Sequence, residues 1–192
     1  MAEELRGRRA AVLATDGVEQ VELTRPQEAL LEAGATVELV SLRPGIIRAM
    51  DHLEPADAFL VDRTVDEVES SDYDFLVLPG GVNNPDKLRV NEMAVAFVRS
   101  FVAAGKPLGV ICHGAWTLVE AGVVGGRTLT SYPSIKTDIR NAGGRWVDEE
   151  LHDDGQVVSS RRPADLDAFC AGIVRRFRQG TTSTRQPGDM AA

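Results

Sequence analysis

Residues 105–121 read GKPLGVICHGAWTLVEA, and this stretch decides the fold prediction. Its segment 108–111 is a short apolar run after a glycine and a proline, which is typical of a buried parallel strand. Residues 115–121 are largely apolar and contain neither proline nor glycine, which predicts a helix of about two turns ending at Gly122. Cys112 therefore lies at a sharp strand-to-helix turn, with the mechanics of a nucleophile elbow.

This position has consequences for the chemistry of the Cys112 thiol. A thiol at a helix N-terminus faces the positive end of the helix dipole and free backbone N–H groups, and both stabilise the thiolate. The adjacent His113 can serve as a base or as an ion-pair partner of the sulfur. A Cys-His pair also occurs as a structural cysteine followed by a solvent-facing histidine. The strand, the turn, Gly114 and the helix together favour a nucleophile.

The composition is that of an ordinary globular protein, with 192 residues, 43% hydrophobic residues and 26% charged residues. We expect a single domain over residues 1–179 and a disordered tail over 180–192, where the composition becomes polar and small. No run approaches the length of a membrane helix and residues 1–10 lack a signal-peptide core, so we expect a cytoplasmic protein without membrane contact. The net charge of -8 argues against nucleic acid as a partner.

The cysteines indicate neither a disulfide framework nor a metal centre. There are two of them, Cys112 and Cys170, and neither belongs to a CxxC motif or a Cys/His cluster. Cys170 falls on the apolar stripe of the last predicted helix, which makes it a core residue. We therefore expect no metal and no cofactor.

Strands and helices alternate along the chain. Buried strands are expected at 10–14, 36–42, 75–78 and 108–111, and shorter ones at 46–50, 58–61, 128–130, 145–147 and 157–160. Helices are expected from residue 18 to 33 with Pro26 as a kink or as the true start, from 88 to 104, from 134 to 141 with Ser134 as N-cap, and from 163 to 177.

This alternation predicts an α/β fold with a largely parallel sheet covered on both faces. In such sheets the functional site lies outside the carboxyl ends of the strands. Three features are expected there: the loop at residues 16–22, the loop at residues 80–86, and Cys112.

Several short segments together resemble one family. They are Val21-Glu22-Leu23, Leu78-Pro79-Gly80-Gly81, Asn91-Glu92, Ile111-Cys112-His113-Gly114, Ala121-Gly122-Val123, Asn141-Ala142-Gly143, and Ser159-Ser160-Arg161 with Asp165-Leu166 close behind. The chain resembles the ThiJ/PfpI superfamily over residues 8–178, and most of all its PfpI-type stress proteins. The resemblance implies a flavodoxin-like three-layer α/β sandwich, related to the class I glutamine amidotransferase domain, that assembles as a homodimer or a hexamer.

The resemblance also implies the roles of individual residues. The family's nucleophile falls on Cys112, its neighbouring histidine on His113, and its buried carboxylic acid, which contacts the thiol, on Glu19. A carboxyl beside a thiolate has a raised pKa and can stay protonated, donating a hydrogen bond to sulfur. The residue pattern alone favours a solvated acid in the first turn of a helix for Glu19.

Further positions follow from the same resemblance. The backbone of Gly80 and Gly81, with the N–H of His113, matches the family's oxyanion pocket. The glutamate that PfpI-type enzymes borrow from the next subunit to complete a Cys-His-acid triad is replaced here by Asp86, whose side chain is shorter, in a loop one residue longer. Trp116 stands where many relatives have glutamine, and it either lines the site or packs under the helix.

The resemblance implies a stress-protective enzyme whose Cys112 attacks reactive carbonyls, as a glyoxalase or as a protein deglycase on methylglyoxal or glyoxal adducts of protein side chains. The older family label is intracellular cysteine peptidase. Peptidase activity would depend on correct geometry between His113 and Asp86 in an oligomer. The alternative is a non-enzymatic redox sensor or stress chaperone in which Cys112 is oxidised to sulfinic acid. A glutamine amidotransferase half is disfavoured because the last histidine, His152, is not followed by the required glutamate.

Overall fold

The computed structural model describes residues 4–180. Apart from Gly180, the predicted tail at 180–192 lies outside the described residues, and the assignment of a single domain to 1–179 stays a prediction. Within residues 4–180, no helix is both long enough and apolar enough to cross a membrane.

A seven-stranded sheet forms the centre of the described chain, in the order β10-β11-β7-β6-β1-β2-β5. Neighbouring strands are parallel except for the β10/β11 pair. This confirms the predicted, mostly parallel α/β sheet. The strands are β1 (Arg9–Leu13), β2 (Thr36–Ser41), β5 (Arg63–Thr64), β6 (Phe75–Leu78), β7 (Leu108–Ile111), β10 (Leu151–Asp153) and β11 (Val157–Ser160).

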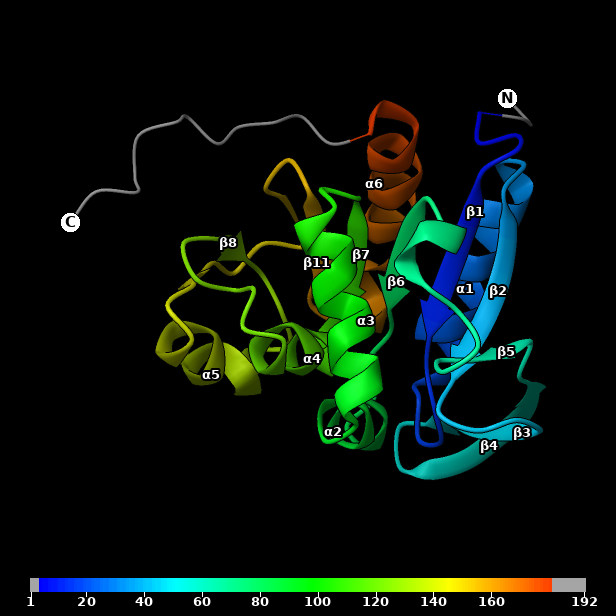
Figure 1. The fold of residues 1–192 in the computed structure, drawn as a ribbon. Coiled ribbons are helices and arrows are strands. Elements are labelled where there is room, and N and C mark those ends of the chain that lie inside the picture. The colour runs from blue at the N-terminus through cyan, green and yellow to red at the C-terminus, as the bar shows by residue number, and fades with distance from the viewer. Residues whose placement is uncertain (1–3, 181–192) are drawn as a thin grey trace.

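Helices cover both faces of the sheet because side chains alternate between the faces along each strand. Ala10 and Val12 of β1 pack against the layer of α1 (Gln20–Glu32) and α6 (Leu166–Gln179), whereas Ala11 and Leu13 face the opposite layer. Figure 1 shows these helices around the sheet. That layer contains α2 (Asn83–Arg89), α3 (Glu92–Ala103), α4 (Ala115–Glu120) and α5 (Lys136–Asn141). Cys170 is buried in the α1/α6 layer, as predicted.

Two small sheets lie outside the central one. Strands β3 (Ile46–Asp51) and β4 (Glu54–Leu60) form an antiparallel hairpin, which confirms the two short strands expected in this region. Strands β8 (Thr128–Leu129) and β9 (Arg145–Trp146) pair in parallel. Sequence patterns missed β5 and β10, which are two and three residues long and too short to show a hydrophobic period.

Three helix predictions need correction. Helix α1 begins at Gln20 and includes Pro26, so this proline is not the start of the helix. Residues 83–86 are helical rather than a loop, and the single helix expected over 88–104 is divided into α2 and α3. The division occurs at Asn91, whose side chain accepts a hydrogen bond from the N–H of Ala94 at 3.0 Å and so caps α3.

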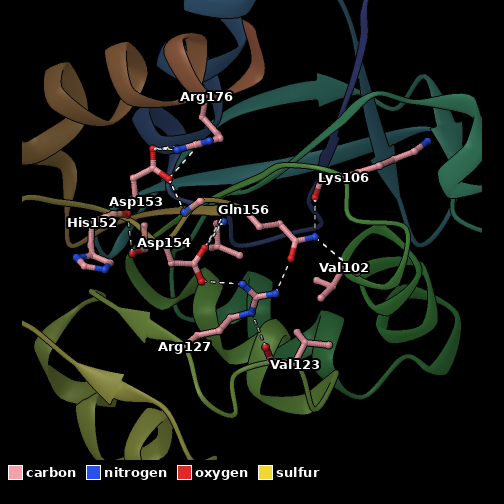
Figure 2. A network of polar contacts seen from close by, with 12 residues as sticks. Val102, Lys106, Val123, Arg127, His152, Asp153, Asp154, Gln156 and Arg176 are labelled. Atoms are coloured by element: carbon pink, nitrogen blue, oxygen red, sulfur yellow. Dashed lines mark hydrogen bonds and ion pairs between the residues drawn. The ribbon is translucent and has the colours of Figure 1, made fainter. Parts of the chain in front are cut away.

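A network of charged and amide side chains surrounds the amino end of β7 (Figure 2). Arg127 donates hydrogen bonds to Asp154 at 2.7 Å and to the side-chain oxygen of Gln156 at 2.5 Å. The side-chain amide of Gln156 donates in turn to the carbonyl of Lys106 at 3.1 Å, and the backbone carbonyl of Gln156 accepts the N–H of Leu108 at 2.9 Å. This network ties the entry of β7 to the segment that precedes β11.

Candidate active site

Cys112 lies at the carboxyl end of β7, on the turn that leads into α4. A short 3₁₀ turn at Cys112–Gly114 connects the two elements, which confirms the predicted elbow. The φ angle of Cys112 is 61°, a left-handed conformation that costs a non-glycine residue about 1–2 kcal/mol. A Cβ on Gly114 would lie 2.5 Å from the carbonyl oxygen of Leu78, so only glycine lets the turn pack this closely against β6. The turn therefore holds the thiol in a strained and defined position.

Glu22, and not Glu19, supplies the carboxyl beside the thiol. Glu22 is fully buried, interacts with the Cys112 side chain, and accepts the N–H of Gly80 on its Oε2 at 2.9 Å. The Glu19 carboxylate instead accepts the backbone N–H of His52 at 3.1 Å. The prediction that Glu19 contacts the thiol is wrong because Glu19 precedes α1 in an extended conformation and is directed to the β3/β4 hairpin.

A signal for Glu22 was present in the sequence. Val18, Glu22, Pro26 and Leu30 follow one another at intervals of four residues, and all four are buried. Such spacing places side chains on one face of a helix, so a carboxyl within an apolar stripe is the feature to notice. Buried carboxylic acids are rare unless they are paired or functional.

Burial governs the proton affinities of the two groups. Loss of solvent raises the pKa of Glu22 to about 8, so this carboxyl keeps its proton at neutral pH. Burial also raises the pKa of the Cys112 thiol, and a negative charge on Glu22 raises it further, although the N–H groups of His113 and Gly81 oppose this. The expected lowering of the Cys112 pKa by the helix terminus is therefore outweighed. A protonated Glu22 removes the charge repulsion, and its Oε1 has no conventional hydrogen bond among the described residues.

His113 is the base nearest to the thiol. Its Nδ1 lies 3.2 Å from the sulfur of Cys112, and its Nε2 lies 3.0 Å from the hydroxyl oxygen of Ser134. His113 is buried, with 8% of the residue surface exposed, and burial lowers the pKa of its imidazole. A neutral imidazole in this position has a lone pair with which to accept the thiol proton.

Two aromatic rings hold the imidazole of His113 in place. The ring of Tyr132 stacks on it at a centroid distance of 4.6 Å, and the ring of Trp116 lies 5.3 Å away at a tilt of 59°. The indole N–H of Trp116 donates to Asp138 at 2.8 Å. Trp116 thus lies beside His113 and is tied to α5, while its part in substrate binding stays a prediction. Tyr132 had no distinguishing pattern in the sequence.

The backbone N–H groups of Gly80 and Gly81 have different partners in the site. The N–H of Gly80 is bound by Glu22 and so is not free for a substrate oxygen. The N–H groups of Gly81 and His113 interact with the sulfur instead. A Cβ on Gly80 would lie 2.6 Å from Glu22 Oε2 and 2.7 Å from the Cβ of Cys112, and one on Gly81 would lie 2.4 Å from a backbone oxygen. Both glycines are required for this close approach.

Asp86 is not brought to His113 within the described chain. Its side chain is exposed on α2, while the second nitrogen of His113 contacts Ser134. The contact between Asp86 and His113 of a neighbouring subunit stays a prediction.

Among residues 4–180, Glu19, Asp51 and His52 have potential metal-ligand atoms within 4.8 Å of one another. Asp51 and His52 are exposed, and His52 pairs with Asp51 at 2.9 Å, so the ion pair accounts for this group without a metal.

Comparisons with known proteins agree on one family. A model described as the DJ-1/PfpI family matches residues 8–176. A deglycase from Pyrococcus horikoshii is 44% identical over 166 residues, which cover 86% of this chain and 97% of the relative. A putative cysteine protease from Bacillus subtilis, YraA, is 37% identical, with 84% and 94% covered. The crystal structure of DJ-1beta from Drosophila melanogaster superposes with a TM-score of 0.79 at 26% identity, with 93% and 95% covered.

Proposed function

The chain belongs to the DJ-1/PfpI family, and we propose that it is a cysteine-dependent enzyme acting on reactive carbonyls. Its substrates are small dicarbonyls such as methylglyoxal and glyoxal, or their adducts on protein side chains, so that the activity is that of a glyoxalase or a deglycase. One observation carries the proposal: the buried thiol of Cys112 contacts a base, His113, on one side and a protonated acid, Glu22, on the other.

The first step is addition of the thiol to the carbonyl. His113 Nδ1 takes the proton from Cys112, and the sulfur forms a bond to the carbonyl carbon while the π electrons move to the carbonyl oxygen. The N–H groups of Gly81 and His113, which interact with the sulfur, supply the donors for the developing oxyanion. Glu22 then gives its proton to that oxygen, which completes a thiohemiacetal.

Later steps use the same two proton carriers. With methylglyoxal, the Glu22 carboxylate removes the proton from the carbon bonded to sulfur, and return of a proton to the adjacent carbon converts the adduct into a lactoyl thioester. Water cleaves the thioester to lactate and regenerates the thiol, so the net reaction is addition of one water. With a glycated side chain, the amine, thiol or guanidine of the protein is the group released.

A peptidase and a redox sensor are the competing functions. Proteolysis needs an acid that orients His113, and within the chain the second nitrogen of His113 contacts the neutral Ser134. A sulfinate on Cys112 would accept hydrogen bonds from Glu22 and from the backbone N–H groups, which favours the redox sensor as second candidate.

We further propose that the protein assembles as a homodimer or hexamer in the cytoplasm. The region of α2 and α3 exposes large apolar side chains next to Asp86, namely Val82, Val90 and Met93, as expected of a contact between subunits. Both Cys112 and Cys170 are free thiols, which agrees with a reducing compartment.

The test compares the wild type with Cys112→Ser. Each protein is incubated with methylglyoxal, and the loss of dicarbonyl and the formation of lactate are followed, with mass spectrometry of Cys112 in parallel. We expect catalytic lactate formation that disappears in the variant. Equal rates in both proteins, with ready oxidation of Cys112, would reject the carbonyl enzyme and favour the redox sensor.

A further inference from the structure

The imidazole of His113 makes one polar contact at each nitrogen. Nδ1 lies 3.2 Å from Cys112 Sγ and Nε2 lies 3.0 Å from Ser134 Oγ. Ser134 is 21 residues further along the chain, in a 3₁₀ turn at Pro133–Ile135 that precedes α5. Its side chain was expected to cap a helix, but α5 begins after Ile135 and the hydroxyl is directed to the imidazole instead. The contact is thus formed by the tertiary fold.

A neutral imidazole carries one N–H and one lone pair, so its two contacts cannot be chosen independently. For Nδ1 to accept the proton of the Cys112 thiol, the hydrogen of His113 must be on Nε2. An Nε2–H needs an acceptor, and the hydroxyl oxygen of Ser134 is the acceptor at hydrogen-bond distance. A hydroxyl can both accept and donate, but in the donating arrangement the lone pair would be on Nε2 and the reactive nitrogen would be blocked.

We propose that Ser134 is a positioning residue that fixes the Nε2–H tautomer of His113 and so keeps Nδ1 free to take the proton from Cys112. The inference rests on the proposed function for its catalytic meaning, although the tautomer itself can be measured without turnover. It assigns the orientation of the base to a neutral hydroxyl of the same chain.

The neutral acceptor has a second consequence. A carboxylate at Nε2 would stabilise the imidazolium and hold the proton on His113, whereas a hydroxyl gives a smaller stabilisation. The imidazole can therefore pass the thiol proton on during later steps. Stacking with Tyr132 and contact with Trp116 already restrict the orientation of the His113 ring. The hydrogen bond to Ser134 therefore has only to determine which ring nitrogen carries the hydrogen.

The first test determines the tautomer of His113 by NMR of the protein labelled with ¹⁵N histidine. The three histidines are assigned with His52→Gln and His152→Gln. We expect the wild type at alkaline pH to show His113 with its hydrogen on Nε2, and Ser134→Ala to show a mixture of both tautomers. An Nδ1–H tautomer in the wild type, or unchanged spectra in Ser134→Ala, would overturn the proposal.

The second test is the pH dependence of Cys112 alkylation by iodoacetamide, with Cys170→Ala as the common background. Without the hydroxyl acceptor the His113 imidazolium is less stable, so less Cys112 thiolate is present at a given pH. Ser134→Ala should therefore shift the pH of half-maximal alkylation rate upward and lower the rate at neutral pH by about tenfold. Ser134→Thr, which keeps the hydroxyl, should restore the profile, and Thr137→Ala, an exposed hydroxyl three residues away, should leave it unchanged.

These outcomes separate the two proposals. If Cys112→Ser still forms lactate, the proposed function fails, while the tautomer and alkylation results still decide the role of Ser134. If Cys112→Ser is inactive and the profile of Ser134→Ala coincides with that of Thr137→Ala, the function stands and the role of Ser134 is rejected.

Discussion

The two ends of strand β7 differ in how the polar side chains around them are paired. At its amino end, Arg127, Asp154 and Gln156 satisfy one another through hydrogen bonds of 2.5 to 2.9 Å (Figure 2). The carboxyl end is four residues further along the strand. There Cys112 and Glu22 are buried with no cationic side chain paired to either among residues 4–180, and the Oε1 of Glu22 has no conventional hydrogen bond within the same residues.

The difference separates stability from function along one strand. A network of charges that satisfy one another through hydrogen bonds restricts the entry of β7. The carboxyl end retains groups whose pKa values are shifted by burial, which costs stability and provides an acid and a nucleophile. The amino end should therefore respond to substitution mainly in stability, and the carboxyl end mainly in activity.

The largest expected effect is the loss of activity in Glu22→Gln. The amide keeps an oxygen for the N–H of Gly80 but cannot give or take a proton, so kcat on methylglyoxal should fall by about 10²–10⁴-fold. The matched control is Glu19→Gln, which changes the acid expected from the sequence and should retain activity within about tenfold of wild type. Loss of activity in Glu19→Gln together with an active Glu22→Gln would reverse the assignment.

The next effect concerns the amino end of β7. In Arg127→Met the partly buried Asp154 loses its cation, which should lower the free energy of unfolding by about 3–5 kcal/mol. Urea denaturation measures this, and the alkylation rate of Cys112 in the folded variant should stay unchanged. The control is Arg25→Met at the exposed pair with Asp167, where the expected change is about 0–1 kcal/mol. Equal losses in both variants would contradict the comparison.

The smallest effect is a pH dependence of stability. Folding raises the pKa of Glu22 from 4.5 to about 8, so between these values the folded state holds a proton that the unfolded chain has lost. The free energy of unfolding attributable to Glu22 therefore falls as pH rises through this window and is constant outside it.

Denaturation at about pH 5 and about pH 9, in the Cys112→Ser background, should show this dependence. We compare the free energy of unfolding of Glu22→Gln with that of its parent at each pH. From the lower to the higher pH this difference should shift in favour of Glu22→Gln by about 2–4 kcal/mol, because each unit of pKa shift corresponds to about 1.4 kcal/mol. Glu19→Gln serves as reference for a carboxyl in the same segment. Parallel pH profiles for the parent and Glu22→Gln would show that Glu22 does not hold its proton in the folded protein.

Sequence reasoning succeeded for elements with a clear local pattern. The run at residues 108–111 was predicted as a strand, and the helix after Gly114 was predicted to about its observed length. It failed for α2, because Asn83, Asn84 and Pro85 favour turns in isolation and are helical here only in the packed structure. Ser134 was predicted as an N-cap because a serine at the start of a helix commonly caps it, whereas its hydroxyl contacts His113 in the folded chain.

The sequence by itself determined the mostly parallel α/β fold and the placement of Cys112 and His113 together on an elbow. These depend on hydrophobic periodicity and on the conformations open to neighbouring residues, which are properties of short segments. Only the tertiary structure decided that Glu22 rather than Glu19 contacts the thiol, that Ser134 contacts His113, and that the pKa of Cys112 is raised. These depend on which distant segments meet and on how much solvent they exclude, and desolvation is a property of the packed molecule as a whole.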